Sequence, residues 1–139
     1  MRRSPVVLAC LLAATLAAWG CDNGPDSTPT TPTAPQVTET FTGTVTLNGS
    51  ITHSFAATSA GAVVATITSL APTTGVVGFQ LGTWNTVTCS AVLSNDLATA
   101  ASVLQGNTQS SASLCIKLHD PNGALADAPV TYTVTVTHY

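Results

Sequence analysis

The sequence predicts an all-β protein: a single antiparallel β-sandwich of about seven or eight strands, jelly-roll or immunoglobulin-like, after a signal peptide and a disordered linker. Apolar residues recur with a period of two along residues 36–139, and turn residues separate the runs. Threonine fills many of the alternate positions, where a β-branched but polar side chain suits the solvent face of a strand. A sustained helical stripe is missing from this stretch, which leaves the all-β class.

The first half of the domain contains four expected strands, at residues 41–47, 51–57, 62–70 and 76–81. Asn48 and Gly49 lie between the first two, and this pair is the strongest short signal for a hairpin turn. In the fourth strand, Val77, Phe79 and Leu81 share one face, as expected of a strand with one buried side.

The second half contains expected strands at residues 87–93, 114–118 and 129–138, with a loop and a short strand near Val103 in residues 95–105. A turn over residues 82–86 carries Trp84. Another turn is expected at residues 120–123, because Pro121 fixes φ and Gly123 is free to take a positive φ. The last strand is the most regular, with valine and tyrosine facing one way and threonine the other.

The N-terminus has the pattern of an export signal. Arg2 and Arg3 precede an apolar run over residues 5–18, and the small residue Gly20 precedes Cys21. This arrangement resembles the lipobox of bacterial lipoproteins. The resemblance implies that residues 1–20 are a lipoprotein signal peptide and that Cys21 becomes a lipidated, palmitate-bearing N-terminus. The protein would then be held by lipid in a membrane of the bacterial cell envelope, facing the periplasm or the exterior.

Other interpretations of this segment are weaker. The apolar run is shorter than the roughly 20 residues of a membrane-spanning helix, and polar residues start directly after Cys21. The arginine pair alone gives little support to a folded-export signal. Asp22 resembles the inner-membrane retention signal of some enteric lipoproteins, but the choice between inner and outer membrane stays open.

Residues 21–35 are the expected linker between the lipidated cysteine and the domain. They are rich in proline and threonine and have no large apolar residue after Cys21, so they cannot bury enough surface to fold. Repeated proline favours extended segments and a semi-rigid tether. The β-sandwich domain is then residues 36–139, which is long enough for a single core.

The charge balance limits the class of partner. Without residues 1–20, Lys117 is the only Lys or Arg against six Asp and Glu residues, a formal net charge of −5. One lysine cannot neutralise a row of phosphates, so nucleic-acid binding is excluded. Electrostatic docking on an anionic bilayer is disfavoured for the same reason. Attachment to the membrane therefore depends on the lipid of Cys21.

Four cysteines divide by position. Cys10 lies in the signal and Cys21 takes the lipid, which leaves Cys89 and Cys115 as a pair in an exported chain. An oxidising compartment favours a disulfide between them, on the outer surface because Cys115 faces opposite to Ile116. Two alternatives are zinc binding with a histidine, which lacks closely spaced ligands, and two free thiols in a reducing compartment.

Four short sequence segments in the domain resemble those of a known family. They are residues 49–55, 60–67, 114–118 and 130–136. They resemble the bacterial pre-peptidase C-terminal type of β-sandwich. Members of that family are usually non-catalytic appendages of secreted enzymes or surface proteins, and some relatives bind polysaccharide or collagen. The resemblance implies a structural or binding role. The chain lacks the acidic residues with which some relatives bind calcium.

The sequence shows no catalytic motif. A nucleophile-elbow serine, a zinc-binding His-Glu-x-x-His and a phosphate-binding glycine loop are all missing. His53 shares a face with Ile51 and Phe55, which indicates a partly buried histidine, and His119 and His138 are expected at strand ends. We therefore expect no metal and no cofactor, and an enzyme is the least favoured of the function classes.

Trp84 is the remaining candidate for a ligand contact. A tryptophan in a turn can stack on a sugar ring or anchor a partner, or it can fold back as a lid on the end of the sandwich. The sequence thus predicts a lipid-anchored cell-envelope protein with a non-catalytic structural or binding β-sandwich. The alternative is an accessory module that binds polysaccharide, or an envelope protein, at the cell surface.

Overall fold

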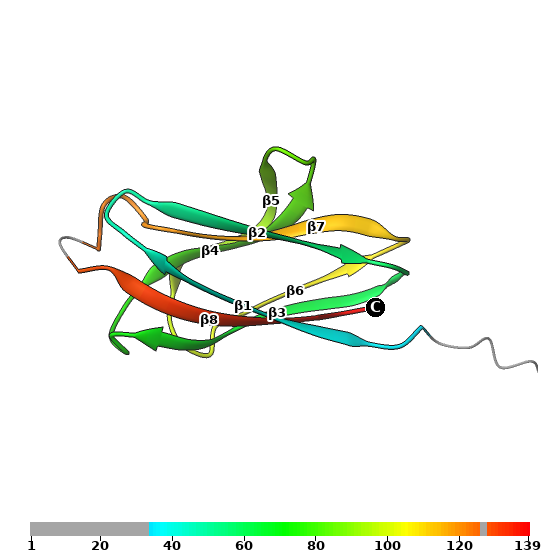
Figure 1. The fold of residues 1–139 in the computed structure, drawn as a ribbon, viewed down its shortest axis with the longest axis horizontal. Helices are drawn as coiled ribbons and strands as arrows, with labels where there is room; N and C mark the ends of the chain where they lie inside the picture. The colour runs from blue at the N-terminus through cyan, green and yellow to red at the C-terminus, as the bar shows by residue number, and fades with distance from the viewer. Residues whose placement is uncertain (1–33, 126–127) are drawn as a thin grey trace, which may run out of the picture. The chain divides into compact units, whose positions relative to one another are not determined.

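The computed structural model describes residues 34–125 and 128–139, which form an antiparallel β-sandwich of eight strands (Figure 1). The strands are β1 (Val37–Val45), β2 (Ser50–Ala57), β3 (Gly61–Ala71), β4 (Val77–Trp84), β5 (Cys89–Ala98), β6 (Val103–Thr108), β7 (Ala112–His119) and β8 (Val130–His138). The predicted fold class is confirmed. Among these described residues there is no helix of the length and apolarity needed to cross a membrane. Residues 1–33, which include the predicted signal, Cys21 and most of the linker, lie outside the described residues.

Two four-stranded sheets make up the sandwich. The first sheet has the order β1-β8-β3-β6 and the second has the order β2-β7-β4-β5. The described strands β4 and β5 are the one pair of consecutive strands that share a sheet, so all the other connections cross between the sheets. Strands β1 and β2 therefore meet along one long side of the sandwich, and β5 and β6 meet along the other.

The predicted hairpin at Asn48 and Gly49 is wrong in its pairing. The turn itself forms, with Asn48 at φ 54° and the Gly49 N–H donating to the Thr46 carbonyl at 2.8 Å. However, β1 pairs with β8 and β2 pairs with β7, so the turn joins the two sheets. A buried carboxylate explains this in part, because Asp120 accepts a hydrogen bond from the Asn48 N–H at 2.8 Å and holds the turn against the segment after β7.

The core lies between the sheets and follows the alternation predicted from the sequence. Buried apolar side chains come from inward positions of the strands, with the fully buried members being Val45, Ala65, Ile67, Val77, Phe79, Ala98, Ile116, Leu118, Val134 and Val136. The opposite face of the first sheet is a threonine array. Four threonines of β1 stand directly across from four of β8, in the pairs Thr38–Thr137, Thr40–Thr135, Thr42–Thr133 and Thr44–Thr131. These pairs keep the outer face polar without charge, and cross-strand threonine pairs also stabilise a sheet.

The region around Trp84 differs from its prediction. Residues 82–84 belong to β4, and the turn occupies residues 85–88, where the Asn85 side-chain oxygen accepts hydrogen bonds from the N–H groups of Val87 and Thr88. This local Asx-type turn replaces the expected break at Gly82. Strand β5 starts at Cys89 and continues to Ala98, through part of the segment expected to be loop. The short strand expected near Val103 is present as β6.

Candidate binding site

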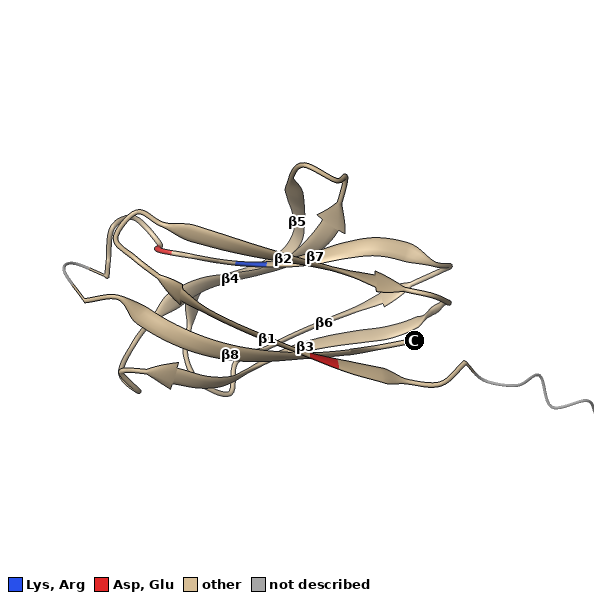
Figure 2. Ribbon diagram, viewed as in Figure 1, with Lys and Arg blue, Asp and Glu red and all other residues tan. Residues whose placement is uncertain are grey.

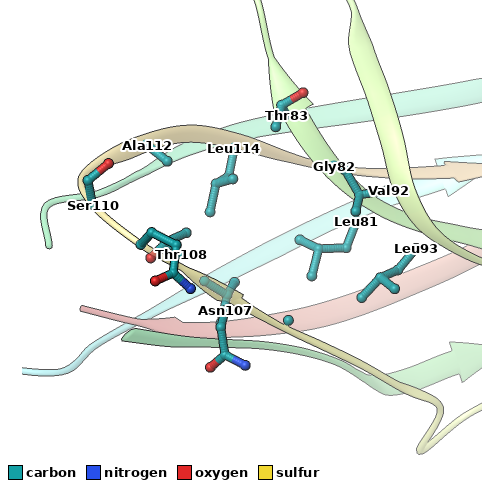
Figure 3. A pocket seen from close by; sticks show the side chains of 13 residues that line it. Leu81, Gly82, Thr83, Val92, Leu93, Asn107, Thr108, Ser110, Ala112 and Leu114 are labelled. Carbon is teal, nitrogen blue, oxygen red and sulfur yellow. The ribbon is translucent and has the colours of Figure 1, made fainter. Parts of the chain in front are cut away.

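A pocket of about 200 Å³ opens on the side of the sandwich where β5 and β6 meet (Figure 3). It is lined by residues of β3, β4, β5, β6, β7 and the β6–β7 connection, namely Val63, Leu81, Gly82, Thr83, Val92, Leu93, Gly106, Asn107, Thr108, Gln109, Ser110, Ala112 and Leu114. The leucines come from the second sheet, and Gly106 comes from the first. The pocket is therefore a gap between the two sheets at their edge.

The shape of the β4–β5 hairpin helps to create this gap. The pairing of β4 with β5 shifts in register between Leu81 and Gly82. At Gly82 the backbone of β5 comes so close that an added Cβ would lie 2.7 Å from the Ser90 carbonyl carbon, so a larger residue does not fit. The hairpin tip stands away from the second sheet in Figure 1. Because the tip leaves the sheet, it does not close the side of the sandwich.

Gly106 is the second cause of the pocket. It occupies an inward position of β6, between the half-buried residues Leu104 and Thr108. A Cβ added to Gly106 would meet just one atom within 4 Å, the Leu93 Cδ1 at 3.7 Å. The backbone at Gly106 does not have a positive φ, so a larger residue would suffer no conformational strain there. The missing side chain leaves this space open.

The lining of the pocket is apolar with a few neutral polar groups. The walls are aliphatic, with Val63, Leu81 and Leu114 buried at the bottom. Thr83, Thr108 and Ser110 add neutral polar groups. Of the residues that the structure describes around the pocket, none has a titratable side chain. Charged side chains are sparse on the sandwich as a whole (Figure 2). The pocket can hold an apolar group but offers no acid, base or nucleophile with a lowered pKa.

Trp84 and the disulfide lie beside the pocket without forming part of it. The Cys89–Cys115 disulfide is present, with a Cα–Cα distance of 5.8 Å, and it ties the start of β5 to β7. Cys115 belongs to the outward row of β7, but it is fully buried, so the expectation that it lies on the outer surface is wrong. Trp84 pairs with Cys89 in register and is half-buried, so it stands on the disulfide side of the hairpin. Trp84 does not line the pocket.

The opposite side of the sandwich, where β1 and β2 meet, is filled by aromatic side chains. The His53 Nε2 lies 2.7 Å from the Tyr132 hydroxyl, and the Phe41 ring stacks on His53 at 5.0 Å. Burial lowers the pKa of His53 below 6.5 and raises the pKa of Tyr132 to about 12. His53 is thus a partly buried histidine held by the core, as its sequence pattern indicated.

The other two histidines also have structural partners. His138 is the last residue of β8, is 3% exposed, and places its Nε2 2.9 Å from Glu39 Oε1. His119 ends β7, with its Nε2 3.5 Å from Asp96 Oδ1. Ser94 donates to the same Asp96 oxygen at 3.2 Å and not to His119, so this trio does not activate a nucleophile. Within residues 34–125 and 128–139, no cluster of three or more His, Cys, Asp or Glu side chains is placed to hold a metal ion.

Asp120 is a structural carboxylate. It is 7% exposed, and its two oxygens accept from the backbone N–H groups of Asn48 and Leu125, at 2.8 and 3.0 Å. Its own N–H donates to the Gly49 carbonyl at 2.9 Å. The turn expected at residues 120–123 forms, with Asn122 and Gly123 at positive φ. Asp120 joins this turn to the β1–β2 turn and is not among the residues that line the pocket.

Comparison with known proteins gives no assignment: the chain matches no family model and no curated protein. The resemblance to the pre-peptidase C-terminal sandwich stays a prediction. Sequence reasoning missed the pocket. Its one signal in the sequence is Gly106, a glycine in the apolar phase of an alternating strand, where a side chain would be expected to enter the core.

Proposed function

We propose that the protein is a lipid-anchored component of the bacterial cell envelope whose β-sandwich binds a partner without catalysis. The location is supported by the lipobox-like sequence that ends at Cys21 and by the Cys89–Cys115 disulfide, which suits an oxidising compartment. The resemblance to non-catalytic sandwich domains of secreted proteins agrees with this role.

One observation carries the binding role, which is the apolar pocket at the β5–β6 side. Ligand pockets are concave, mostly apolar, and furnished with a few polar groups that fix orientation. The pocket has such a lining, and its neutral residues supply no group for acid–base or covalent chemistry. A packed sandwich with a purely structural role would gain stability by placing a side chain at Gly106.

The proposed location is tested by the intact mass of the protein extracted from the membrane of its own cells. A chain that begins at Cys21 and carries acyl groups is expected. Reduction should then raise the mass by about two hydrogens, because the Cys89–Cys115 disulfide becomes two thiols. A chain that begins at Met1, or one without added acyl mass, would contradict the anchoring.

The proposed binding role is tested with benzene as a neutral apolar probe, because apolar cavities of about 150 Å³ take up benzene. Methyl resonances of Leu81, Leu93 and Leu114 are followed by NMR as benzene is added. We expect saturable shifts in the wild-type protein and none in Gly106→Leu, which fills the pocket. Gln105→Leu, on the outward face of the same strand, is the matched control and should behave as wild type. Absence of any pocket shift in the wild type would contradict the binding role.

Recognition of polysaccharide is the second candidate, and it is favoured by the position of Trp84. Its side of the hairpin adjoins the outer face of the second sheet, where Thr52, Lys117 and Gln80 form one cross-strand row. A half-buried tryptophan on a face that also carries polar side chains is suited to stacking on a sugar. Trp84 fluorescence should then change with at least one envelope glycan, and Trp84→Ala should remove that binding. Unchanged fluorescence across a glycan panel would exclude this candidate.

A further inference from the structure

Strand β6 leaves one of its edges unpaired. In the described part of the chain it pairs with β3 alone, as the last strand of the first sheet. Its opposite edge therefore presents backbone N–H and C=O groups that no neighbouring strand satisfies. The strand also lacks the usual protection of an edge, since its sequence VLQGNT contains no charged residue and no proline.

The pocket lies directly against this free edge. Gly106, Asn107 and Thr108 of β6 line it, and Gln109 and Ser110 continue the same side beyond the strand. A peptide that added to β6 as a further strand would point alternate side chains inward, between the two sheets. One of them would enter the space left by Gly106. About 200 Å³ exceeds the 150 Å³ that holds a benzene molecule, so a leucine or phenylalanine side chain fits.

The lack of charge in the pocket lining favours a peptide over a lipid as the ligand. A fatty acid or phospholipid would bring an anionic headgroup to the mouth of the pocket, and none of the described lining residues is a cation. Lys117 lies on β7 in the row of outward residues, away from the lining. A neutral lipid tail would also leave the edge groups of β6 without partners. An uncharged extended peptide satisfies both the apolar pocket and the free edge.

We propose that the pocket and the free edge of β6 together form a docking site for an extended, uncharged peptide segment, which pairs with β6 and places one large apolar side chain in the pocket. This inference rests on the proposed binding role and assigns its ligand class. In strand addition of this kind, main-chain hydrogen bonds give affinity and side-chain pockets give specificity. The partner is therefore selected by an aliphatic or aromatic residue within a neutral, strand-forming stretch.

The test uses isotope-labelled mature protein, purified after processing by the cells that produce it. Three capped peptides serve as probes. The first is a heptapeptide of serine and threonine with a central leucine. The second has a central alanine, and the third keeps the leucine but carries N-methyl groups on alternate amides, which blocks strand pairing. Amide shifts across Val103–Thr108 are followed by NMR in wild type, Gly106→Leu and the control Gln105→Leu.

We expect the leucine peptide to shift the β6 amides in wild type and Gln105→Leu. The alanine peptide should bind about tenfold more weakly, because it loses most of the apolar burial. The N-methylated peptide and Gly106→Leu should give no binding. If benzene enters the pocket but the leucine peptide leaves β6 unchanged, the inference is wrong and the binding role stands. If benzene also fails, the proposed function fails with it. Concentration-dependent β6 shifts without peptide would show a second copy at the edge and overturn the inference.

Discussion

The two long sides of the sandwich each contain a glycine on the inward face of an edge strand, and the two glycines have opposite surroundings. On the β1–β2 side, a Cβ added to Gly43 would lie 2.7 Å from Tyr132 Cζ. On the β5–β6 side, a Cβ added to Gly106 would touch Leu93 Cδ1 alone, at 3.7 Å. The space beside Gly43 is occupied by the Tyr132 ring, whereas the space beside Gly106 is not filled by a side chain of the described residues.

This difference shows that side chains fill the gap between the sheets on one side of the sandwich and leave it open on the other. Tyr132, His53 and Phe41 fill the β1–β2 side with packed and hydrogen-bonded aromatic groups. The β5–β6 side has no comparable filling among the described residues, because the β4–β5 hairpin turns away and β6 offers a glycine. Cores are packed with few voids larger than a water molecule, so the β5–β6 side differs from ordinary core packing.

The largest effect is expected from the disulfide that anchors the hairpin at the open side. Replacing both Cys89 and Cys115 by alanine should destabilise the fold by about 3.5 kcal/mol in the chain-entropy model for a separation of 26 residues. Urea denaturation measures this loss. Reductant should lower the stability of the wild type and leave the double variant unchanged. A loss below about 1 kcal/mol would show that the disulfide is not what holds the hairpin.

Gly43→Ala should cost about 3 kcal/mol. The new methyl group must displace the Tyr132 ring, which adds overpacking strain and weakens the hydrogen bond to His53. Denaturant midpoints compare it with Gly106→Ala, its counterpart on the other side. Equal midpoints for the two variants would contradict the difference between the sides.

Tyr132→Phe should cost about 1–2 kcal/mol, because it keeps the ring but leaves the His53 Nε2 without its partner. Thermal unfolding at pH 8 gives the loss. His53→Gln combined with Tyr132→Phe forms a double-mutant cycle that isolates the contribution of this hydrogen bond. A coupling energy near zero would mean that the pair does not stabilise the β1–β2 side.

Stability should also fall in mild acid through His53. Its pKa is lowered by burial, so the unfolded chain binds a proton at a higher pH than the folded protein. This contribution is complete above pH 6.5 and is lost as the pH falls from there to the lowered folded pKa. Urea denaturation across this range should show the loss in wild type and a smaller loss in His53→Gln. A pH dependence that is identical in both would contradict the role of His53.

Gly106→Ala should have the smallest effect and the opposite sign. Alanine in place of a strand glycine stabilises by about 0.5–1 kcal/mol when the backbone and the space permit it, and both do so here. Gln105→Ala, which stays on the outward face, controls for strand propensity. A destabilised Gly106→Ala would mean that the space beside Gly106 is filled.

The alternating pattern of residues predicted the architecture because it reports directly which face of a strand is buried. It located β3, β7 and β8, with Val134 and Val136 inside, and it gave Cys115 the phase opposite to Ile116, although Cys115 is fully buried and not at the outer surface. The pattern could not show which strands pair. Asn48 and Gly49 form a turn in either case, and the long-range bonds of Asp120 and the partners β8 and β7 decide that the turn crosses between sheets.

The candidate site was harder to predict from the sequence, because a pocket forms where no side chain fills the space between the sheets. Gly106 is a single glycine in a short strand, and its meaning depends on Leu93 and Leu81 arriving from the other sheet. Trp84 was expected in a turn, but it ends β4, and its place on the disulfide side of the hairpin follows from the register of β4 with β5. Neither the pocket at Gly106 nor the position of Trp84 can be predicted without knowing how the strands pack.

The most direct test of the β5–β6 side is a crystal structure under xenon pressure, because xenon binds in apolar cavities. The account predicts a xenon atom among Leu81, Leu93 and Leu114 in the wild-type protein, and none in a crystal of Gly106→Leu. A wild-type crystal with the pocket collapsed and free of xenon would contradict the account, and with it the proposed binding role of this side.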